Sequence, residues 1–232
     1  MIYLRKAQDR GHANHGWLDS WHTFSFANYH DPAFMGFSAL RVINEDVIDA
    51  GQGFGTHPHK DMEILTYVLS GTVEHEDSMG NKEQIPAGEF QIMSAGTGVR
   101  HSEYNASQSD PLHLYQIWII PERAGITPRY DQRRFADISG RQYVLTPDAR
   151  HDSLKVNQDM TLSRWAFKAG ETDRVEIADK RNVWIQVVKG NVQVNGQSAT
   201  TSDAFAIADE QTITLQAETD AEILLFDLPP VH

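Results

Sequence analysis

The 232-residue sequence contains no cysteine. Disulfides, thiolate metal ligands and cysteine nucleophiles are therefore all excluded. The sequence also lacks any run approaching about 18 apolar residues, the length that a membrane-spanning helix needs. Residues 1–16 contain no apolar segment of the kind found in secretory signals. We therefore expect a cytoplasmic protein with no membrane association.

Basic residues are scarce relative to acidic ones. The chain has 20 Lys and Arg against 32 Asp and Glu, which gives a formal net charge of −12 at pH 7. Binding to nucleic acid needs clustered Lys and Arg, whereas the densest basic spots here are isolated pairs, Arg133-Arg134 and Lys180-Arg181. Nucleic acid is therefore not expected as a direct partner, although this charge permits a protein partner.

Clear helical periodicity is also lacking, apart from a short helical turn expected within residues 16–21. The chain instead has many short runs of alternating or β-branched residues, separated by turns that contain glycine. The clearest runs are residues 39–44, 63–69, 88–93 and 112–119. Many short strands with frequent turns predict an all-β sandwich or barrel.

The second half of the chain repeats the pattern of the first half. Residues 67–75 and residues 186–194 each run from an apolar strand through a glycine into a second, Val-containing strand. Asn195-Gly196 then predicts a type I′ hairpin turn. An internal duplication explains this pattern. We expect two domains, residues 1–130 and residues 131–232, with a connector over residues 121–139.

Two short motifs place potential metal ligands at positions i and i+2. These motifs are His57-Pro58-His59 and His101-Ser102-Glu103. On a strand such positions share a face and lie about 6.5–7 Å apart. Two neighbouring strands of this kind would direct three imidazoles and one carboxylate at a common point. The second half has no His-x-His pair, so only the first half is expected to hold the metal.

This ligand set predicts one divalent transition metal. Imidazole and carboxylate ligands with open coordination positions suit a non-haem iron centre and tolerate other first-row metals. We expect Fe²⁺ first, with Zn²⁺, Ni²⁺, Co²⁺, Cu²⁺ or Mn²⁺ as alternatives.

The residues around both motifs resemble a known family. Residues 51–63 read Gly-Gln-Gly-Phe-Gly-Thr-His-Pro-His-Lys-Asp-Met-Glu, which resembles the first cupin motif, and residues 88–103 resemble the second. Ser94 replaces the usual proline, and the loop before His101 is longer than in most cupins. These departures are similar to those of the pirin family, as are residues 22–26 and 36–44. The chain looks closest to the bacterial pirins described as quercetin 2,3-dioxygenases.

The resemblance implies two tandem cupin barrels, also called double-stranded β-helices or jelly rolls. The N-terminal domain would bind the metal through His57, His59, His101 and Glu103, and the C-terminal domain would lack ligands. The general cupin pattern would instead use Glu63 as the carboxylate. Local geometry favours Glu103, because Glu63 lies six residues beyond His57, about 20 Å along a straight strand. Glu63 would need a bend or bulge to reach the metal.

The same resemblance implies an enzyme that cleaves the flavonol quercetin with O₂. Glu103 would accept the proton of the substrate's 3-hydroxyl group as the catalytic base. We expect a monomer, since duplicated halves can cover each other. The alternative is a non-enzymatic, metal- or redox-responsive regulatory protein that binds a protein partner, as other pirins do. A different cupin reaction on another small molecule also stays open.

The other histidines and the N-terminal aromatic residues have simpler interpretations. His22, His75 and His113 are expected to pack or form hydrogen bonds, with a place beside the metal ligands as the alternative. The aromatic residues between positions 17 and 37 are expected in the core, and some of them could shape a pocket for a planar ligand. They are Trp17, Trp21, Phe24, Phe26, Tyr29, Phe34 and Phe37.

Overall fold

The computed structural model describes residues 1–230, which form two compact units. The N-terminal unit comprises Gly11–Phe135 and Val156–Gln158. The C-terminal unit comprises Met1–Arg10, Ala136–Lys155 and the chain from Asp159 onward. As domain bounds, 1–130 and 131–232 stay a prediction. The contact-based units differ from them in assigning the first ten residues to the C-terminal unit, because strand β1 pairs there with β20.

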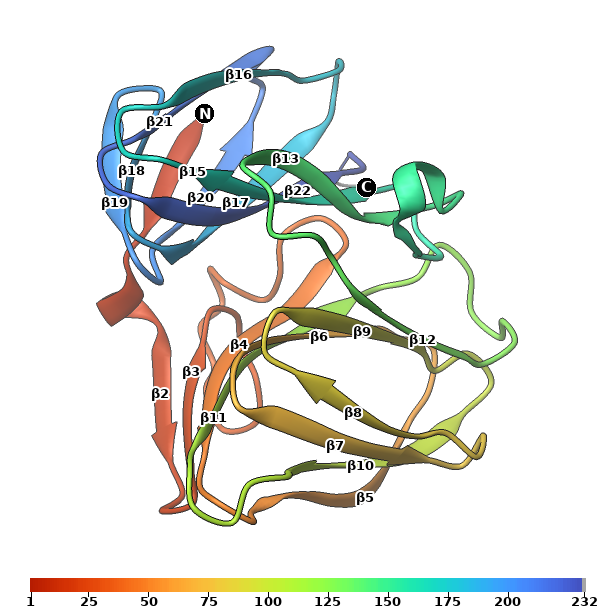
Figure 1. Cartoon of the computed structure of the whole chain (residues 1–232). Coiled ribbons are helices and arrows are strands. Elements are labelled where there is room, and N and C mark those ends of the chain that lie inside the picture. The colour runs from red at the N-terminus through yellow and green to blue at the C-terminus, as the bar shows by residue number, and fades with distance from the viewer. Residues whose placement is uncertain (231–232) are drawn as a thin grey trace. The chain divides into compact units, whose positions relative to one another are not determined.

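The N-terminal unit consists of a seven-stranded and a four-stranded antiparallel sheet (Figure 1). The order of the larger sheet is β12-β9-β6-β11-β4-β3-β2, and the order of the smaller is β5-β10-β7-β8. The strands are β2 (Gly11–Asn14), β3 (Leu18–His22), β4 (Leu40–Ile48), β5 (Gly53–His59), β6 (Glu63–Ser70), β7 (Thr72–Asp77), β8 (Lys82–Pro86), β9 (Glu89–Ser94), β10 (Val99–Asn105), β11 (Leu112–Ile119) and β12 (Arg129–Arg134).

One part of the space between these two sheets is filled by an apolar cluster. Leu18, Ile48 and Leu112 lie opposite one another on β3, β4 and β11, and they pack with Val73 and Ile85 of the smaller sheet. Each fully buried side chain of this size stabilises the fold by about 1.5–3 kcal/mol. This apolar cluster closes one part of the unit and leaves the remaining inward positions for the site described below.

The C-terminal unit repeats the same two-sheet plan. Its sheet orders are β1-β20-β17-β22-β15-β13-β14 and β16-β21-β18-β19. The strands are β1 (Ile2–Arg5), β13 (Gly140–Thr146), β14 (Leu154–Lys155), β15 (Thr161–Phe167), β16 (Thr172–Glu176), β17 (Asn182–Lys189), β18 (Asn191–Val194), β19 (Gln197–Thr200), β20 (Ala204–Ala208), β21 (Thr212–Ala217) and β22 (Ala221–Leu228). Its interior is an apolar cluster that includes Phe205, Ile213 and Ile223.

Turn geometry agrees with the predicted duplication. Gly71 joins β6 to β7 with φ 83°, and Gly190 joins β17 to β18 with φ 84°. Asn195 and Gly196 have φ 47° and 80°, as a type I′ hairpin requires, and they connect β18 to β19. The predicted hairpin and the predicted repeat of strand pairs are therefore both confirmed.

One smaller expectation is wrong. Residues 16–21 form no helical turn, because Leu18–His22 is strand β3 and pairs with both β2 and β4. The expected connector, residues 121–139, contains strand β12, which pairs with β9 at the edge of the larger sheet, and it also contains the boundary between the two units after Phe135. In the described part of the chain the helices are two 3₁₀ turns, η1 (Ala7–Asp9) and η2 (Arg150–Asp152). Neither has the length or apolar character to cross a membrane.

Candidate metal centre and its pocket

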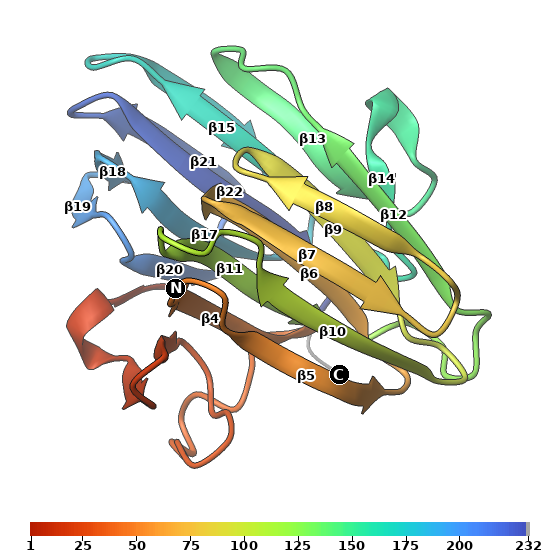
Figure 2. The same cartoon turned by 60° about the horizontal axis from the view of Figure 1, so that its bottom comes forward.

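The two predicted ligand motifs lie on neighbouring strands. His57 and His59 are on β5, His101 and Glu103 are on β10, and His101 stands directly opposite His57 (Figure 2). Strand β5 is at the edge of its sheet, where the missing backbone N–H of Pro58 costs no ladder hydrogen bond. The sheet therefore accommodates the His-Pro-His sequence and turns both imidazoles to one side.

A β-bulge in β5 adds an aromatic residue to the same face. The register changes between His101, opposite His57, and Glu103, opposite Phe54. Two residues of β5, Gly55 and Thr56, thus stand against the single residue Ser102 of β10. This extra residue allows Phe54 to line the same cavity as His57, although an odd spacing would normally put them on opposite faces.

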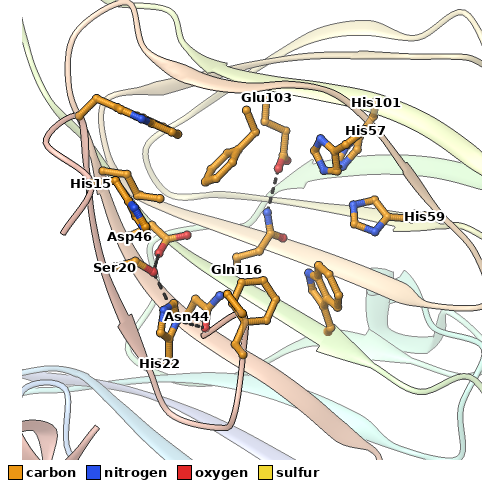
Figure 3. Close-up of a pocket in the computed structure, with 16 residues that line it drawn as sticks. His15, Ser20, His22, Asn44, Asp46, His57, His59, His101, Glu103 and Gln116 are labelled. Carbon is orange, nitrogen blue, oxygen red and sulfur yellow. Dashed lines mark hydrogen bonds between the residues drawn. The ribbon is translucent and has the colours of Figure 1, made fainter. Parts of the chain in front are cut away.

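The three imidazoles converge. One ring nitrogen from each of His57, His59 and His101 lies within 4.8 Å of the others, and the Nε2 atoms of His57 and His101 are 3.0 Å apart. Ring centroids are separated by 4.5 to 4.9 Å in all three pairs. Figure 3 shows the three rings together at one end of the pocket.

Hydrogen bonding and burial prepare these rings to donate electron pairs. Nδ1 of His57 donates to the carbonyl oxygen of Gly55 at 2.8 Å, so a neutral His57 directs the lone pair of Nε2 at the other rings. Burial, assisted by the two neighbouring imidazoles, lowers the pKa of His59 to about 4, and burial also lowers the pKa of His101. Three imidazoles whose ring nitrogens converge in this way can hold a divalent cation between them.

Glu103 approaches this centre from β10 and is held by three side chains of the larger sheet. Its Oε1 accepts hydrogen bonds from Thr66 and Gln91, and its Oε2 accepts one from Gln116 at 2.8 Å. A carboxylate oxygen of Glu103 also lies within 4.8 Å of ring nitrogens of His101 and His75. Glu103, His75 and His101 thus form a second possible metal-binding group, and His101 belongs to both groups.

The donors to Glu103 belong to one polar row that crosses the larger sheet. His22, Asn44, Gln116, Thr66 and Gln91 stand opposite one another on β3, β4, β11, β6 and β9. Gln91 donates to the hydroxyl of Thr66 at 3.0 Å, which links two members of the row. Five strands that are far apart in the sequence thus present polar groups at the same level.

The alternative carboxylate, Glu63, has different partners. It is fully buried and accepts hydrogen bonds from the hydroxyl of Ser94 at 3.0 Å and from the backbone N–H of Asn157 at 3.1 Å. The side-chain amide of Asn157 also donates to both of its oxygens. Glu63 therefore anchors residues 156–158, whereas Glu103 is the carboxylate beside the imidazoles.

The remaining histidines occupy three different environments. His75 is fully buried, bonds Asp77 through Nε2 at 3.0 Å and lies behind His101 with ring centroids 5.4 Å apart. His113 bonds Glu45 at 3.0 Å. His22 lines the pocket. All three form hydrogen bonds as expected, His22 with Asn44 at 2.9 Å, and His75 in addition lies beside the candidate ligand His101.

The imidazoles open into a cavity of about 440 Å³ with aromatic walls. Trp17 packs edge-on against Phe54, with ring centroids 5.3 Å apart. Phe26 packs edge-on against Trp118 at 5.5 Å, and Trp118 contacts the ring of His59 at 5.0 Å. Of the aromatic residues considered from the sequence, Trp17 and Phe26 line this cavity. A planar aromatic ligand suits such walls.

Sequence reasoning missed the polar residues that hold Glu103. Thr66, Gln91 and Gln116 each interrupt an apolar run that the sequence predicts to be a strand. A polar residue at an inward position of such a run was the available signal, because a buried amide or hydroxyl needs a partner. It could not reveal that all three would meet one carboxylate.

Comparison with known proteins gives the same picture over the whole chain. A family model described as Pirin matches residues 3–119, and one described as Quercetinase C-terminal cupin domain matches residues 143–228. These two matches confirm the predicted all-β fold of two cupin domains. A curated protein of Escherichia coli (strain K12) named quercetin 2,3-dioxygenase is 74% identical over 231 residues, covering 100% of both chains.

Solved structures agree closely. The crystal structure of YhhW from Escherichia coli is similar with a TM-score of 0.99 at 74% identity, covering 100% of this chain and 99% of that one. A second structure, described as bacterial pirin YhhW from Escherichia coli in complex with nickel(II), has a TM-score of 0.98 at 74% identity and full coverage of both chains.

Proposed function

Because this chain belongs to the pirin family, we propose that it is a metal-dependent dioxygenase that cleaves the flavonol quercetin with O₂. The observation that carries the proposal is the convergence of three imidazoles at one end of an aromatic-walled cavity. The name of the 74% identical relative supports the substrate. The physiological substrate can be another planar aromatic molecule, since fold and ligands do not determine it.

We assign the metal to His57, His59 and His101, with Glu103 as the fourth ligand. The donor set suits Fe²⁺ and tolerates Zn²⁺, Ni²⁺, Co²⁺, Cu²⁺ or Mn²⁺, and the nickel complex of the similar protein supports a divalent ion. When bound, such a metal supplies a Lewis acid that stabilises the oxygen of a deprotonated hydroxyl group, and open positions for small ligands.

Glu103 is the residue proposed to accept the proton of the flavonol 3-hydroxyl. A general base must lie within hydrogen-bond reach of that proton, and Glu103 stands beside the centre to which the hydroxyl would be drawn. The donors Thr66, Gln91 and Gln116 orient its carboxylate. Removal of the proton makes the flavonol electron-rich, which promotes its reaction with O₂.

The aromatic walls orient the substrate and exclude water. Trp17 and Phe54 form one edge-on pair, and Phe26 and Trp118 form another. Planar rings held between such pairs gain contact area while they lose little conformational freedom. We also propose that the protein is a cytoplasmic monomer.

The test combines elemental analysis with a turnover assay. Purified protein is assayed for bound metal, loaded anaerobically with Fe²⁺ and mixed with quercetin in air. The loss of the near-visible absorbance of quercetin and the uptake of O₂ are followed together. We expect both in the wild type, and we expect His57→Ala to lose metal and turnover together. Intact metal stoichiometry in that variant would refute the ligand assignment.

The same assay separates the regulatory alternative. Stoichiometric metal without turnover of several flavonols would contradict the dioxygenase. That result would favour a metal-responsive protein whose surface changes with the state of the metal. The net charge of −12 is compatible with a protein partner of that kind.

A further inference from the structure

A second polar group lines the same cavity and is not part of the ligand set. Ser20 of β3 stands opposite Asp46 of β4, and His22 stands opposite Asn44 two residues further along the same pair of strands. All four side chains line the cavity, yet none is more than 4% exposed. We call these four residues the β3–β4 polar cluster. Figure 3 shows the cluster across the pocket from the three imidazoles.

The cluster is connected by its own hydrogen bonds. The hydroxyl of Ser20 donates to Oδ1 of Asp46 and lies 3.4 Å from Nδ1 of His22. Nδ1 of His22 in turn lies 2.9 Å from Oδ1 of Asn44. Among the described residues, Ser20 is the one side chain that donates to Asp46. In Figure 3 the other oxygen of Asp46 points into the pocket.

Asp46 is therefore a buried carboxylate with few donors. A carboxylate can accept about four hydrogen bonds, and burying it without them is costly. Burial raises its pKa to about 7, and the nearby Glu103 and Glu45 add to this rise. A ligand whose hydroxyl groups donate hydrogen bonds would therefore stabilise the carboxylate of Asp46.

The arrangement does not suit a nucleophilic triad. In such a triad the histidine lies between the carboxylate and the serine and takes the proton of the serine. Here the carboxylate of Asp46 contacts Ser20 itself and not His22, and Nδ1 of His22 lies closer to Asn44, at 2.9 Å, than to Ser20, at 3.4 Å. The cluster is therefore arranged for binding rather than for acyl transfer.

The strand register determines how far Asp46 lies from Gln116, the hydrogen-bond partner of Glu103. Gln116, which bonds Glu103, is opposite Asn44 on the adjacent strand, and Asp46 lies two residues along β4 from Asn44. One strand spacing and two residues correspond to about 8 Å between the Cα atoms of Gln116 and Asp46. A molecule of two or more aromatic rings can span the cavity between these positions, with the aromatic walls along its faces.

We propose that Asp46, positioned by Ser20, binds phenolic hydroxyl groups on the ring of the substrate that is remote from the metal, and so selects polyhydroxylated aromatic substrates. This inference rests on the proposed function for the class of ligand. It adds a specificity-determining site to the cavity, separate from the residues that hold the metal.

The test compares two flavonols that differ in the remote ring. Quercetin carries two vicinal hydroxyls on that ring, and galangin carries none. Their dissociation constants are measured anaerobically at pH 8 by quenching of tryptophan fluorescence, in metal-loaded and in metal-free protein. We expect the wild type to bind quercetin about tenfold more tightly than galangin in both forms, the effect of one charge-assisted hydrogen bond.

Variants at position 46 should remove this preference. Asp46→Asn should bind the two flavonols within about twofold of each other and leave galangin unchanged, and Asp46→Leu should favour galangin. Asp19→Asn, on the neighbouring strand β3 and outside the cavity lining, is the control and should behave like the wild type. Thermal melting verifies that each variant is folded.

The proposal would be overturned by an equal affinity of the wild type for both flavonols, by an unchanged preference in folded Asp46→Asn and Asp46→Leu, or by an equal loss of affinity for both flavonols in these variants. A preference seen only in metal-loaded protein would also overturn it, because the vicinal hydroxyls would then bind the metal. A retained preference without turnover in air would instead refute the dioxygenase and leave the binding site standing.

Discussion

At the scale of single residues, the two carboxylates Glu103 and Glu63 differ in the hydrogen-bond donors that surround them. Glu103 accepts hydrogen bonds from Thr66, Gln91 and Gln116 beside the imidazoles. Glu63 accepts hydrogen bonds from Ser94 and Asn157, and its role is to hold a chain segment. Two acidic residues of similar burial thus acquire different roles, because their neighbours differ.

The substitution Glu103→Gln tests the base directly. The amide keeps the shape of the side chain but cannot accept the substrate proton, so turnover of quercetin should fall about 10²–10⁴-fold while some metal is retained. Elemental analysis and O₂ uptake measure the two effects separately. Glu63→Gln is the matched control, and its turnover per folded, metal-loaded molecule should stay near that of the wild type. Unchanged turnover in Glu103→Gln would remove this residue from the role of base.

At the scale of elements, the close approach of β5 to β10 decides whether the imidazoles meet. A Cβ atom on Gly53 would lie 2.3 Å from the carbonyl oxygen of Glu103 and 2.5 Å from the Cα of Tyr104. Both are backbone atoms, which cannot move aside as a flexible side chain can. The glycine therefore permits the strand spacing on which the bulge and both ligand pairs depend.

We predict that Gly53→Ala weakens metal binding. The added methyl group must push β5 away from β10, which separates His57 and His59 from His101 and lowers metal affinity about tenfold or more. Competition with a metal chelator measures this change. Gly55→Ala is the control on the same strand, because its Cβ would meet only the hydroxyl of Tyr104, at 3.5 Å. Equal affinity in the two variants would contradict the prediction.

At the scale of the whole molecule, the cavity is kept at the expense of stability. The inward face of β3 and β4 carries the β3–β4 polar cluster where further apolar residues would strengthen the core. Burial raises the pKa of Asp46 from 3.8 to about 7, so the folded protein holds a proton that the unfolded chain releases. The contribution of Asp46 to the free energy of unfolding therefore falls as the pH rises from about 4 to 7, and stays low above that range.

The variant Asp46→Asn should consequently be more stable than the wild type at pH 8. We expect a gain of about 2–4 kcal/mol in the free energy of unfolding at pH 8, which shrinks to about 1 kcal/mol or less at pH 4. Denaturant unfolding of metal-free protein at both pH values, followed by tryptophan fluorescence, measures it. Asp19→Asn, a change on an exposed site of β3, should show no comparable gain. A pH-independent difference would show that Asp46 titrates alike in the folded and unfolded chain.

Much of this architecture follows from the sequence alone. The period of two along a strand determines that His57 and His59 share a face, and that His101 and Glu103 do so as well. The repeated glycine turns at Gly71 and Gly190 are local, so the duplication was predictable. The strand at Leu18–His22 was not, because its propensity is weak and pairing with β2 and β4 decides it.

Only the tertiary structure decided which residues meet across strands. The bulge that turns Phe54 inward, the polar row that reaches Glu103 and the cluster around Asp46 all depend on the register between segments 20 to 50 or more residues apart. Sequence spacing specifies the face of each strand, but register is determined by the packing of the sheets as a whole. For that reason the candidate ligands could be proposed one by one from the sequence, whereas the second wall of their pocket could not.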